Sequence, residues 1–80
     1  MQTIDVDLAK LTPSPYGKPY ADPENVARLV PFDWAHYQPI WVERDGSRLI
    51  IMDGMTRVEI ARQAGLVTLP AYVFPKSGAP

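Results

Sequence analysis

Apolar residues recur along the chain with the spacing of two that is typical of strands. Residues 3–8 alternate between apolar and polar or acidic positions, which predicts a strand with one buried face. Residues 39–44 favour a strand for the same reason, and residues 69–74 are predicted to form the last strand. The segment 48–52 carries an unbroken apolar run, which predicts a strand buried on both faces, as at the centre of a sheet. Asp45-Gly46 is typical of the turn of a hairpin.

Two other segments carry the start and stop signals of helices. Asp-Pro-Glu at residues 22–24 supplies an N-cap, a proline suited to the first helical position and an acid at the positive end of the helix dipole. This helix is predicted to run to about residue 30, because Pro31 cannot continue it. A second helix is predicted over residues 55–64, where Gly65 offers a left-handed cap.

The remaining segments are short. Four prolines and a glycine between residues 12 and 23 predict an irregular loop, in which Tyr16 and Tyr20 are candidate anchors or a lid. Residues 32–37 favour a short helical turn, and residues 75–80 a frayed tail. The resulting order, strand, loop, helix, hairpin, helix and strand, predicts one α+β domain over residues 1–80, with a small mixed sheet and two main helices.

Composition narrows the classes of function. The chain has 80 residues, 46% of them hydrophobic and 21% charged, a balance typical of a small globular domain. Eight basic and nine acidic residues give a net charge of −1. The basic residues are scattered, so strong direct binding to DNA is not expected. They are Lys10, Lys18, Arg28, Arg44, Arg48, Arg57, Arg62 and Lys76.

The sequence lacks the residues that several kinds of functional site require. The absence of cysteine excludes disulfides, thiolate metal sites and cysteine nucleophiles. A single histidine, His36, disfavours a histidine metal centre, and Asp5 and Asp7 have no further ligands nearby, so no metal site is predicted. The N-terminus shows no signal-peptide pattern and no apolar run reaches membrane-spanning length. We therefore expect a cytoplasmic protein without membrane contact.

The junction between the apolar run and the second helix, residues 52–65, reads MDGMTRVEIARQAG. Gly54 permits a sharp turn, and the first amides of a helix have no internal partners, so they attract an anion. Arg57 lies in the first turn, where a guanidinium can bind phosphate bidentately, and Thr56 can add its hydroxyl. The predicted nucleotide or phosphate site comprises Asp53, Gly54, Met55, Thr56 and Arg57.

The same residues allow a purely structural interpretation. Thr56 and Glu59 fit the Thr-x-x-Glu capping box, in which two side chains satisfy the free amides themselves. Asp53 can also cap, and its negative charge would oppose a bound anion. Arg57 would then be a solvated surface residue paired with Asp53 or Glu59. The residues alone leave both interpretations open.

The chain resembles the ParB/sulfiredoxin-like superfamily over nearly its whole length. The shared pattern is a Gln-Pro-Ile strand at residues 38–40, Asp-Gly-x-x-Arg at 53–57, an alanine-containing helix, Gly-Leu at 65–66 and Pro-Ala-x-Val at 70–73. The resemblance implies an α+β domain that binds a nucleotide, CTP, ATP or ADP with Mg²⁺, at the start of this helix. Members include the CTP-binding domain of ParB, sulfiredoxins, an ADP-dependent serine kinase and ParB-like nucleases.

Departures from the family pattern bear on activity. Gly54 and Arg57 match the positions that the family uses around the phosphates. Sulfiredoxins need a cysteine at the position of Met55, so the resemblance does not extend to sulfinic acid reduction. Methionine is no acid, base or Mg²⁺ ligand, which favours ligand binding or protein interaction over catalysis. Asp53 would orient Arg57 or help to hold Mg²⁺.

Two alternatives to a binding module remain. One is a ParB-like nuclease, NTPase or kinase that uses Asp53 with Glu24 or His36 as accessory residues. The other is a protein-interaction domain with a vestigial site, which binds a protein partner or forms a homodimer through the aromatic residues around Trp34 and Trp41. The same two aromatics and Tyr37 are also candidates for stacking on a nucleobase or for completing a small core.

Overall fold

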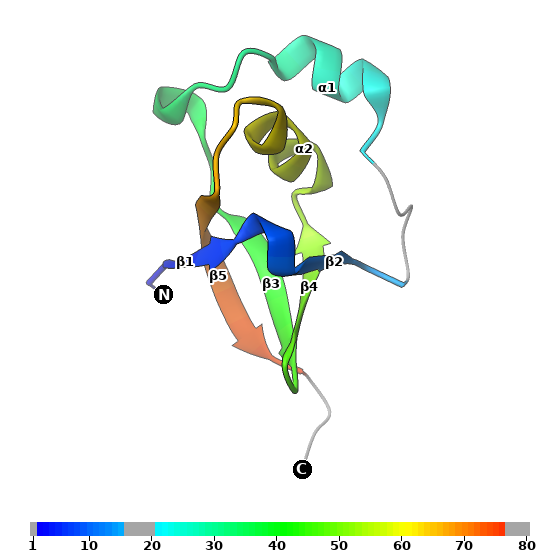
Figure 1. Ribbon diagram of the computed structural model, residues 1–80, viewed down its shortest axis with the longest axis vertical. Helices are drawn as coiled ribbons and strands as arrows, with labels where there is room; N and C mark the ends of the chain where they lie inside the picture. Colours follow the sequence, from blue (N-terminus) through cyan, green and yellow to red (C-terminus); the bar gives the residue numbers. More distant parts are fainter. Residues whose placement is uncertain (1, 16–20, 77–80) are drawn as a thin grey trace.

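The computed structural model describes residues 2–15 and 21–76 and shows a curled sheet with two helices stacked above it, one over the other (Figure 1). In chain order the elements are β1 (Ile4–Asp7), the 3-10 helix η1 (Leu8–Lys10), β2 (Leu11–Pro13), α1 (Pro23–Leu29), the 3-10 helix η2 (Trp34–His36), β3 (Ile40–Asp45), β4 (Arg48–Asp53), α2 (Met55–Gln63) and β5 (Thr68–Pro75). The predicted order of strands and helices is therefore confirmed, with β2 and η1 added to it.

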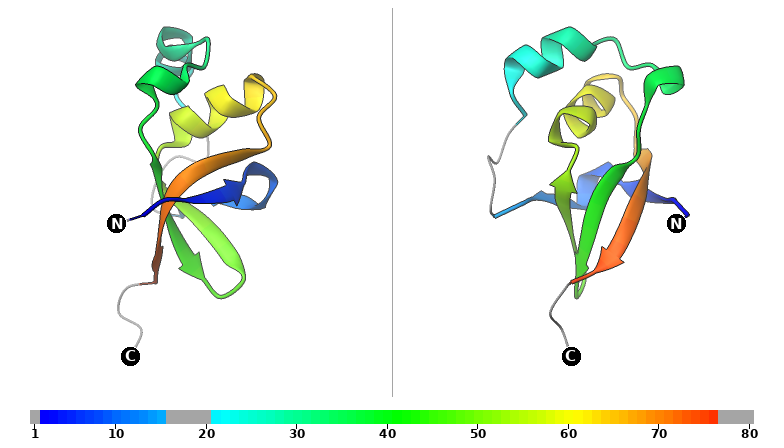
Figure 2. Two further views of the ribbon diagram at one scale, coloured as in Figure 1. Left: turned by 90° about the vertical axis from the view of Figure 1, so that its left-hand side faces the viewer. Right: turned by 180° about the vertical axis from the view of Figure 1, so that it is seen from behind.

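The strands form one mixed sheet in the order β1-β5-β3-β4-β2. β1 pairs with β5 and β3 with β4 in antiparallel fashion, whereas β5 with β3 and β4 with β2 are parallel pairs. The parallel pairs place segments far apart in sequence side by side, as the two further views show (Figure 2). The α+β prediction, a small mixed sheet with two main helices, is confirmed.

The core lies between the inner face of the sheet and α2. Ile40 and Val42 from β3, Val58 and Ala61 from α2, and Leu69 from β5 are all at most 2% exposed. α1 lies over α2, on the side away from the sheet (Figure 1). α2 is therefore held between two layers, and its first turn lies beside the start of β3.

The predicted first residues of two irregular segments, the proline-rich loop and the C-terminal tail, were wrong. The loop predicted from residue 12 begins later, because β2 pairs Thr12 with Ile50 and Pro13 with Ile51 of β4. Proline is tolerated there because β2 is an edge strand and needs no amide on its outer side. Tyr16 and Tyr20 lie outside the described residues.

The prediction of a frayed tail from residue 75 was wrong for Pro75 and Lys76. Pro75 ends β5, and the amide of Lys76 donates to the carbonyl of Arg44 at 3.1 Å. Residues 77–80 lie outside the described part of the chain. The parallel pairing of β5 with β3 includes Pro75, which lies opposite Arg44.

The prediction that the apolar run is buried on both faces holds for part of β4. Ile51 faces the core and Ile50 faces the opposite side of the sheet, and both are buried. Met52, however, is 39% exposed. The centre of the sheet is β3 rather than β4, so the outer face of β4 is covered over only part of its length.

The two tryptophans do not complete the core. Trp34 is 54% exposed and Trp41 is 39% exposed, and only Tyr37 of the three candidate aromatics packs against the core.

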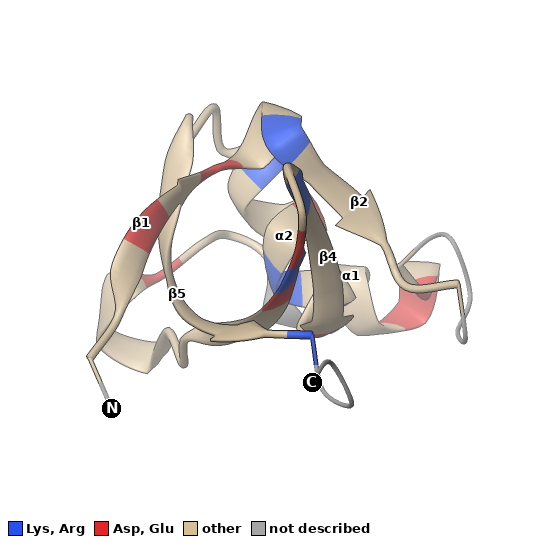
Figure 3. Cartoon of the chain, turned by 90° about the horizontal axis from the view of Figure 1, so that it is seen from below, with Lys and Arg blue, Asp and Glu red and all other residues tan. Residues whose placement is uncertain are grey.

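In the view of Figure 3, basic and acidic residues are interspersed over separate elements. Neither helix of the described segments has the length and hydrophobicity needed to cross a bilayer.

Candidate anion site at the start of α2

Gly54 joins β4 to α2 and is fixed by two separate constraints. Its φ of 114° lies in the left-handed region, which side chains other than glycine rarely adopt. A Cβ at this position would lie 2.4 Å from Cγ2 of Ile40, inside the contact distance. The backbone at the start of α2 therefore approaches β3 more closely than any residue with a side chain allows.

The first amides of α2 are open. The first hydrogen bond within the helix runs from the amide of Val58 to the carbonyl of Gly54 at 3.0 Å. No side chain caps the helix, and no described residue accepts a hydrogen bond from the amides of Met55, Thr56 or Arg57. These three donors and the positive end of the helix dipole are available to an anion.

The capping-box interpretation was wrong. A capping box needs Thr56 at the N-cap position, but the N-cap of α2 is Gly54, two residues earlier, and the helix begins at Met55. Thr56 is thus the second helical residue, and Asp53 does not cap either. A side chain at the N-cap position of α2 would clash with Ile40, so glycine occupies it instead of a capping residue.

Arg57 fastens α2 to the segment that enters β3. Its Nη1 donates to the carbonyls of Gln38 at 2.7 Å and Pro39 at 2.9 Å, and its Nη2 lies 3.4 Å from Oδ2 of Asp53. The side chain is only 26% exposed, so it is not a solvated surface residue. Three of the five guanidinium N–H groups are used, which leaves two for a ligand.

Three further features define the site chemically. The side chain of Met55 packs against the core, so this residue offers only its amide. The carboxylate of Asp53 is 69% exposed and balances the charge of Arg57. Because these two charges cancel, the positive potential of the site comes from the helix amides and dipole.

The two accessory candidates differ in position. Glu24 is exposed at the second position of α1, and no hydrogen bond or ion pair joins it to the residues of the junction among those described. His36 lies in η2, and a cavity of about 70 Å³ brings it together with Arg57. The described lining residues of that cavity are Phe32, Asp33, His36, Tyr37, Arg57 and Ile60.

Asp33 orients the imidazole of His36. Its Oδ2 lies 2.7 Å from Nδ1 of His36, and its Oδ1 accepts the amide of Ala35 at 2.9 Å. The hydrogen bond from His36, and then that from Ala35, hold the pKa of the Asp33 carboxyl below its usual value. Because Asp33 engages Nδ1, Nε2 is the nitrogen of His36 that remains available for proton transfer.

Sequence reasoning missed the partners that hold this junction. Nothing local indicates that Ile40 lies against Gly54 or that the carbonyls of Gln38 and Pro39 bind Arg57. The Gln-Pro-Ile pattern is part of the resemblance to the family, but its contact with the site appears only in the fold. No described group of three or more His, Asp or Glu side chains is arranged to hold a metal ion.

Comparison with solved structures establishes the class of fold. No protein-family model and no curated protein matches the sequence. A sulfiredoxin from Arabidopsis thaliana is 19% identical with a TM-score of 0.76, over 95% of this chain and 88% of that one. A mutant free serine kinase in complex with ADP is 13% identical with a TM-score of 0.75, over 92% of this chain and 31% of that one.

ParB gives a third match. The C-terminally truncated chromosome-partitioning protein ParB from Caulobacter crescentus, complexed with CTP-γ-S, is 19% identical with a TM-score of 0.70. The match covers 95% of this chain and 46% of that one. The fold of this protein is therefore ParB/sulfiredoxin-like, and the chain spans less than half of the matched kinase and ParB chains.

Proposed function

We propose that the start of α2 binds the phosphate groups of a nucleotide. The observation that carries this proposal is the open helix start, in which Gly54 brings three amides forward without any side-chain cap. Matched structures of the same fold support it, because a serine kinase was solved with ADP and a ParB with CTP-γ-S. Helix N-termini after a glycine turn are common phosphate sites.

Each residue of the predicted site has a distinct role in this proposal. The amides of Met55, Thr56 and Arg57 donate to phosphate oxygens, and the hydroxyl of Thr56 adds a fourth donor. The two remaining N–H groups of Arg57 bind a further oxygen. Gly54 keeps the backbone close to β3, so that the helix start stays in place.

Mg²⁺ fits the charge of the site. Asp53 alone would repel a phosphate, but one carboxylate together with phosphate oxygens is an ordinary ligand set for Mg²⁺. Asp53 is the exposed carboxylate next to the open amides. In this proposal it contributes one ligand to the ion that accompanies the nucleotide, and CTP, ATP and ADP are the candidate nucleotides.

Thr56→Asp tests the proposal with opposite effects on binding and stability. A carboxylate in the first turn competes with a phosphate, but it stabilises the free helix through the dipole by about 0.3–1 kcal/mol. Thermal unfolding is measured with CTP, ATP, ADP, phosphate or pyrophosphate, each with Mg²⁺. A nucleotide at about 100 times its Kd stabilises the wild type by about 2.7 kcal/mol, and this gain is lost in Thr56→Asp.

Gln63→Glu is the matched control, because it adds the same charge at the other end of α2. It should keep the nucleotide-dependent stabilisation. Stabilisation that persists in Thr56→Asp, or a wild type that responds to none of these ligands, would contradict the proposal.

One observation favours catalysis as a second candidate. The pair of Asp33 and His36 lies at the same cavity as Arg57, and a carboxylate-oriented imidazole is a common general base. We infer that, if nucleotide is turned over, His36 takes part in proton transfer. Turnover followed by ³¹P NMR with Mg²⁺ should then fall in His36→Gln while binding is retained, and an unchanged rate would exclude this role.

A further inference from the structure

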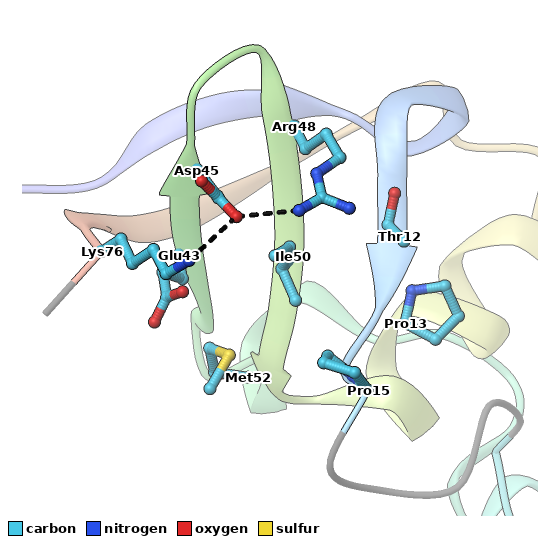
Figure 4. Close-up of a pocket in the computed structure, with 9 residues that line it drawn as sticks. All are labelled: Thr12, Pro13, Pro15, Glu43, Asp45, Arg48, Ile50, Met52 and Lys76. Carbon is cyan, nitrogen blue, oxygen red and sulfur yellow. Dashed lines mark hydrogen bonds and ion pairs between the residues drawn. The ribbon is translucent and has the colours of Figure 1, made fainter.

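A groove of about 270 Å³ lies on the outer face of the sheet, opposite the helices. Figure 4 shows its floor and walls, which come from β2, β3 and β4, from Pro15 just after β2 and from Lys76 just after β5. Side chains alternate between the two faces of a strand, so Ile50 points outward while Ile51 packs in the core. The lining residues are Thr12, Pro13, Pro15, Glu43, Asp45, Arg48, Ile50, Met52 and Lys76.

The floor of the groove is apolar. Ile50 lies between Glu43 of β3 and the residues of β2, and Met52 lies at the end nearer Pro15 (Figure 4). Ile50 is 6% exposed, whereas Met52 is 39% exposed. An aliphatic side chain of a ligand would cover Met52 there and remove apolar surface from water.

One carboxylate of the groove is already neutralised. Oδ2 of Asp45 accepts a hydrogen bond from Nη2 of Arg48 at 2.8 Å and lies 3.5 Å from Nζ of Lys76 (Figure 4). The hydrogen bond from Arg48, with the nearby charge of Lys76, holds the pKa of Asp45 below its usual value. Two cations share one anion, so this end of the groove carries a small excess of positive charge.

Glu43 is different, because no described residue pairs with it. Its side chain is half-buried, and it makes no hydrogen bond or ion pair within residues 2–15 and 21–76. Its cross-strand neighbours are Ile50 on β4 and Phe74 on β5, both apolar. A carboxylate in such surroundings loses part of its hydration without gaining a partner, so it is complementary to a cation.

Aromatic rings border Glu43 on its other side. The ring of Trp41, two residues earlier on β3, lies 4.7 Å from that of Tyr72 and 6.2 Å from that of Phe74. Trp41 is 39% exposed. A carboxylate beside exposed aromatic rings suits a guanidinium, which binds the oxygens as a fork and stacks on a ring with its flat face.

We propose that this outer face binds an extended peptide segment of a partner protein through one arginine. The guanidinium binds Glu43 and stacks on Trp41, and the preceding apolar side chain enters the groove over Ile50 and Met52. Arginine is preferred to lysine because the planar guanidinium makes both contacts at once. The positive excess at Arg48 and Lys76 disfavours a second basic residue in the segment.

The test is an NMR titration of the ¹⁵N-labelled chain with the dipeptide acetyl-Leu-Arg-amide. The matched control peptide carries citrulline, which has the shape of arginine but no charge. We expect saturable shifts at the amides of Glu43 and Ile50 and at the indole of Trp41, with a Kd of about 1 mM. The citrulline peptide should bind at least about tenfold more weakly, since each tenfold step is 1.4 kcal/mol.

Variants of the protein complete the test. Glu43→Gln should weaken arginine-peptide binding about tenfold and leave thermal unfolding unchanged, because Glu43 stabilises no described partner. Glu59→Gln makes the same change of charge on α2 and should leave peptide binding unchanged. Equal binding of the citrulline peptide, unaltered affinity in Glu43→Gln, shifts confined to the helices, or no shifts at about 10 mM peptide would each overturn the proposal.

Discussion

The two helices of this protein begin in opposite ways. α1 begins at Pro23 after Asp22, whose Oδ1 accepts the amide of Glu24 at 2.9 Å. α2 begins at Met55 after Gly54, which has no side chain, and its first three amides have no acceptor among the described residues. The start of α1 is completed by its own residues, whereas that of α2 can be completed by an external acceptor.

The difference shows how a fold can leave the first amides of a helix free to bind a ligand. At α1, the proline lacks an amide and the aspartate binds another, so few donors remain. At α2, the side chain that would cap the helix is excluded by the contact with Ile40. Arg57 then holds the open helix start against the segment before β3.

Gly54→Ala should have the largest effect on this comparison. The new Cβ would clash with Ile40 and force a left-handed φ on alanine, so we expect a loss of about 3 kcal/mol of unfolding free energy in urea denaturation. Gly46→Ala is the control, because its φ of 64° is also positive but no atom lies within 4 Å. It should lose only about 1 kcal/mol. Equal losses would show that the close approach to β3 is unimportant.

Arg57→Ala should lower the unfolding free energy by about 2 kcal/mol, because it leaves the carbonyls of Gln38 and Pro39 without their charged donor. Arg57→Lys should recover only part of this loss. Lysine keeps the positive charge, but its ammonium group cannot donate to as many acceptors in a fixed geometry as a guanidinium does. Chemical denaturation measures both. If Arg57→Ala unfolded at the same denaturant concentration as the wild type, these contacts would not stabilise the fold. This structural role makes Thr56 a better position than Arg57 for testing nucleotide binding.

Asp22→Ala should cost about 1 kcal/mol, the usual value for the loss of an N-cap. Asp22→Asn retains a capping oxygen and should cost much less. Hydrogen exchange of the amides in α1 measures the effect locally, with α2 as the internal reference. If the amides of α1 exchange at the same rate in Asp22→Ala as in the wild type, the Asp22 cap does not stabilise α1.

Asp33, at the start of η2, should make the stability of the protein depend on pH, with a smaller effect than the substitutions above. Its pKa is lowered below 3.8 by His36 and Ala35, so the folded state prefers the carboxylate. Its contribution is complete above pH 3.8 and is lost as the pH falls through the folded pKa. Carbon-detected NMR titration should show the Asp33 pKa moving up towards 3.8 in His36→Ala. An unmoved pKa would exclude His36 as the main cause.

Local signals predicted the elements well where the determining interactions are local. Asp22 and Pro23 act within one turn of α1, and Asp45-Gly46 lies in the hairpin turn between β3 and β4. The capping box at Thr56 failed because the N-cap of α2 is Gly54, where a side chain would clash with Ile40 of a distant strand. β2 was missed because its pairing with β4 compensates for the poor strand propensity of its proline.

The sequence by itself determined the α+β class and the order of the two main helices and of the strands other than β2. These follow from periodicity, caps and turns, which depend on neighbours within a few positions. The tertiary structure decided that the helix start is open and that Arg57 binds carbonyls 18 and 19 residues away. It also decided that Glu43 lies without a described partner on the outer face. These features depend on which strands pair and how closely they approach, and no local pattern of residues encodes such distances.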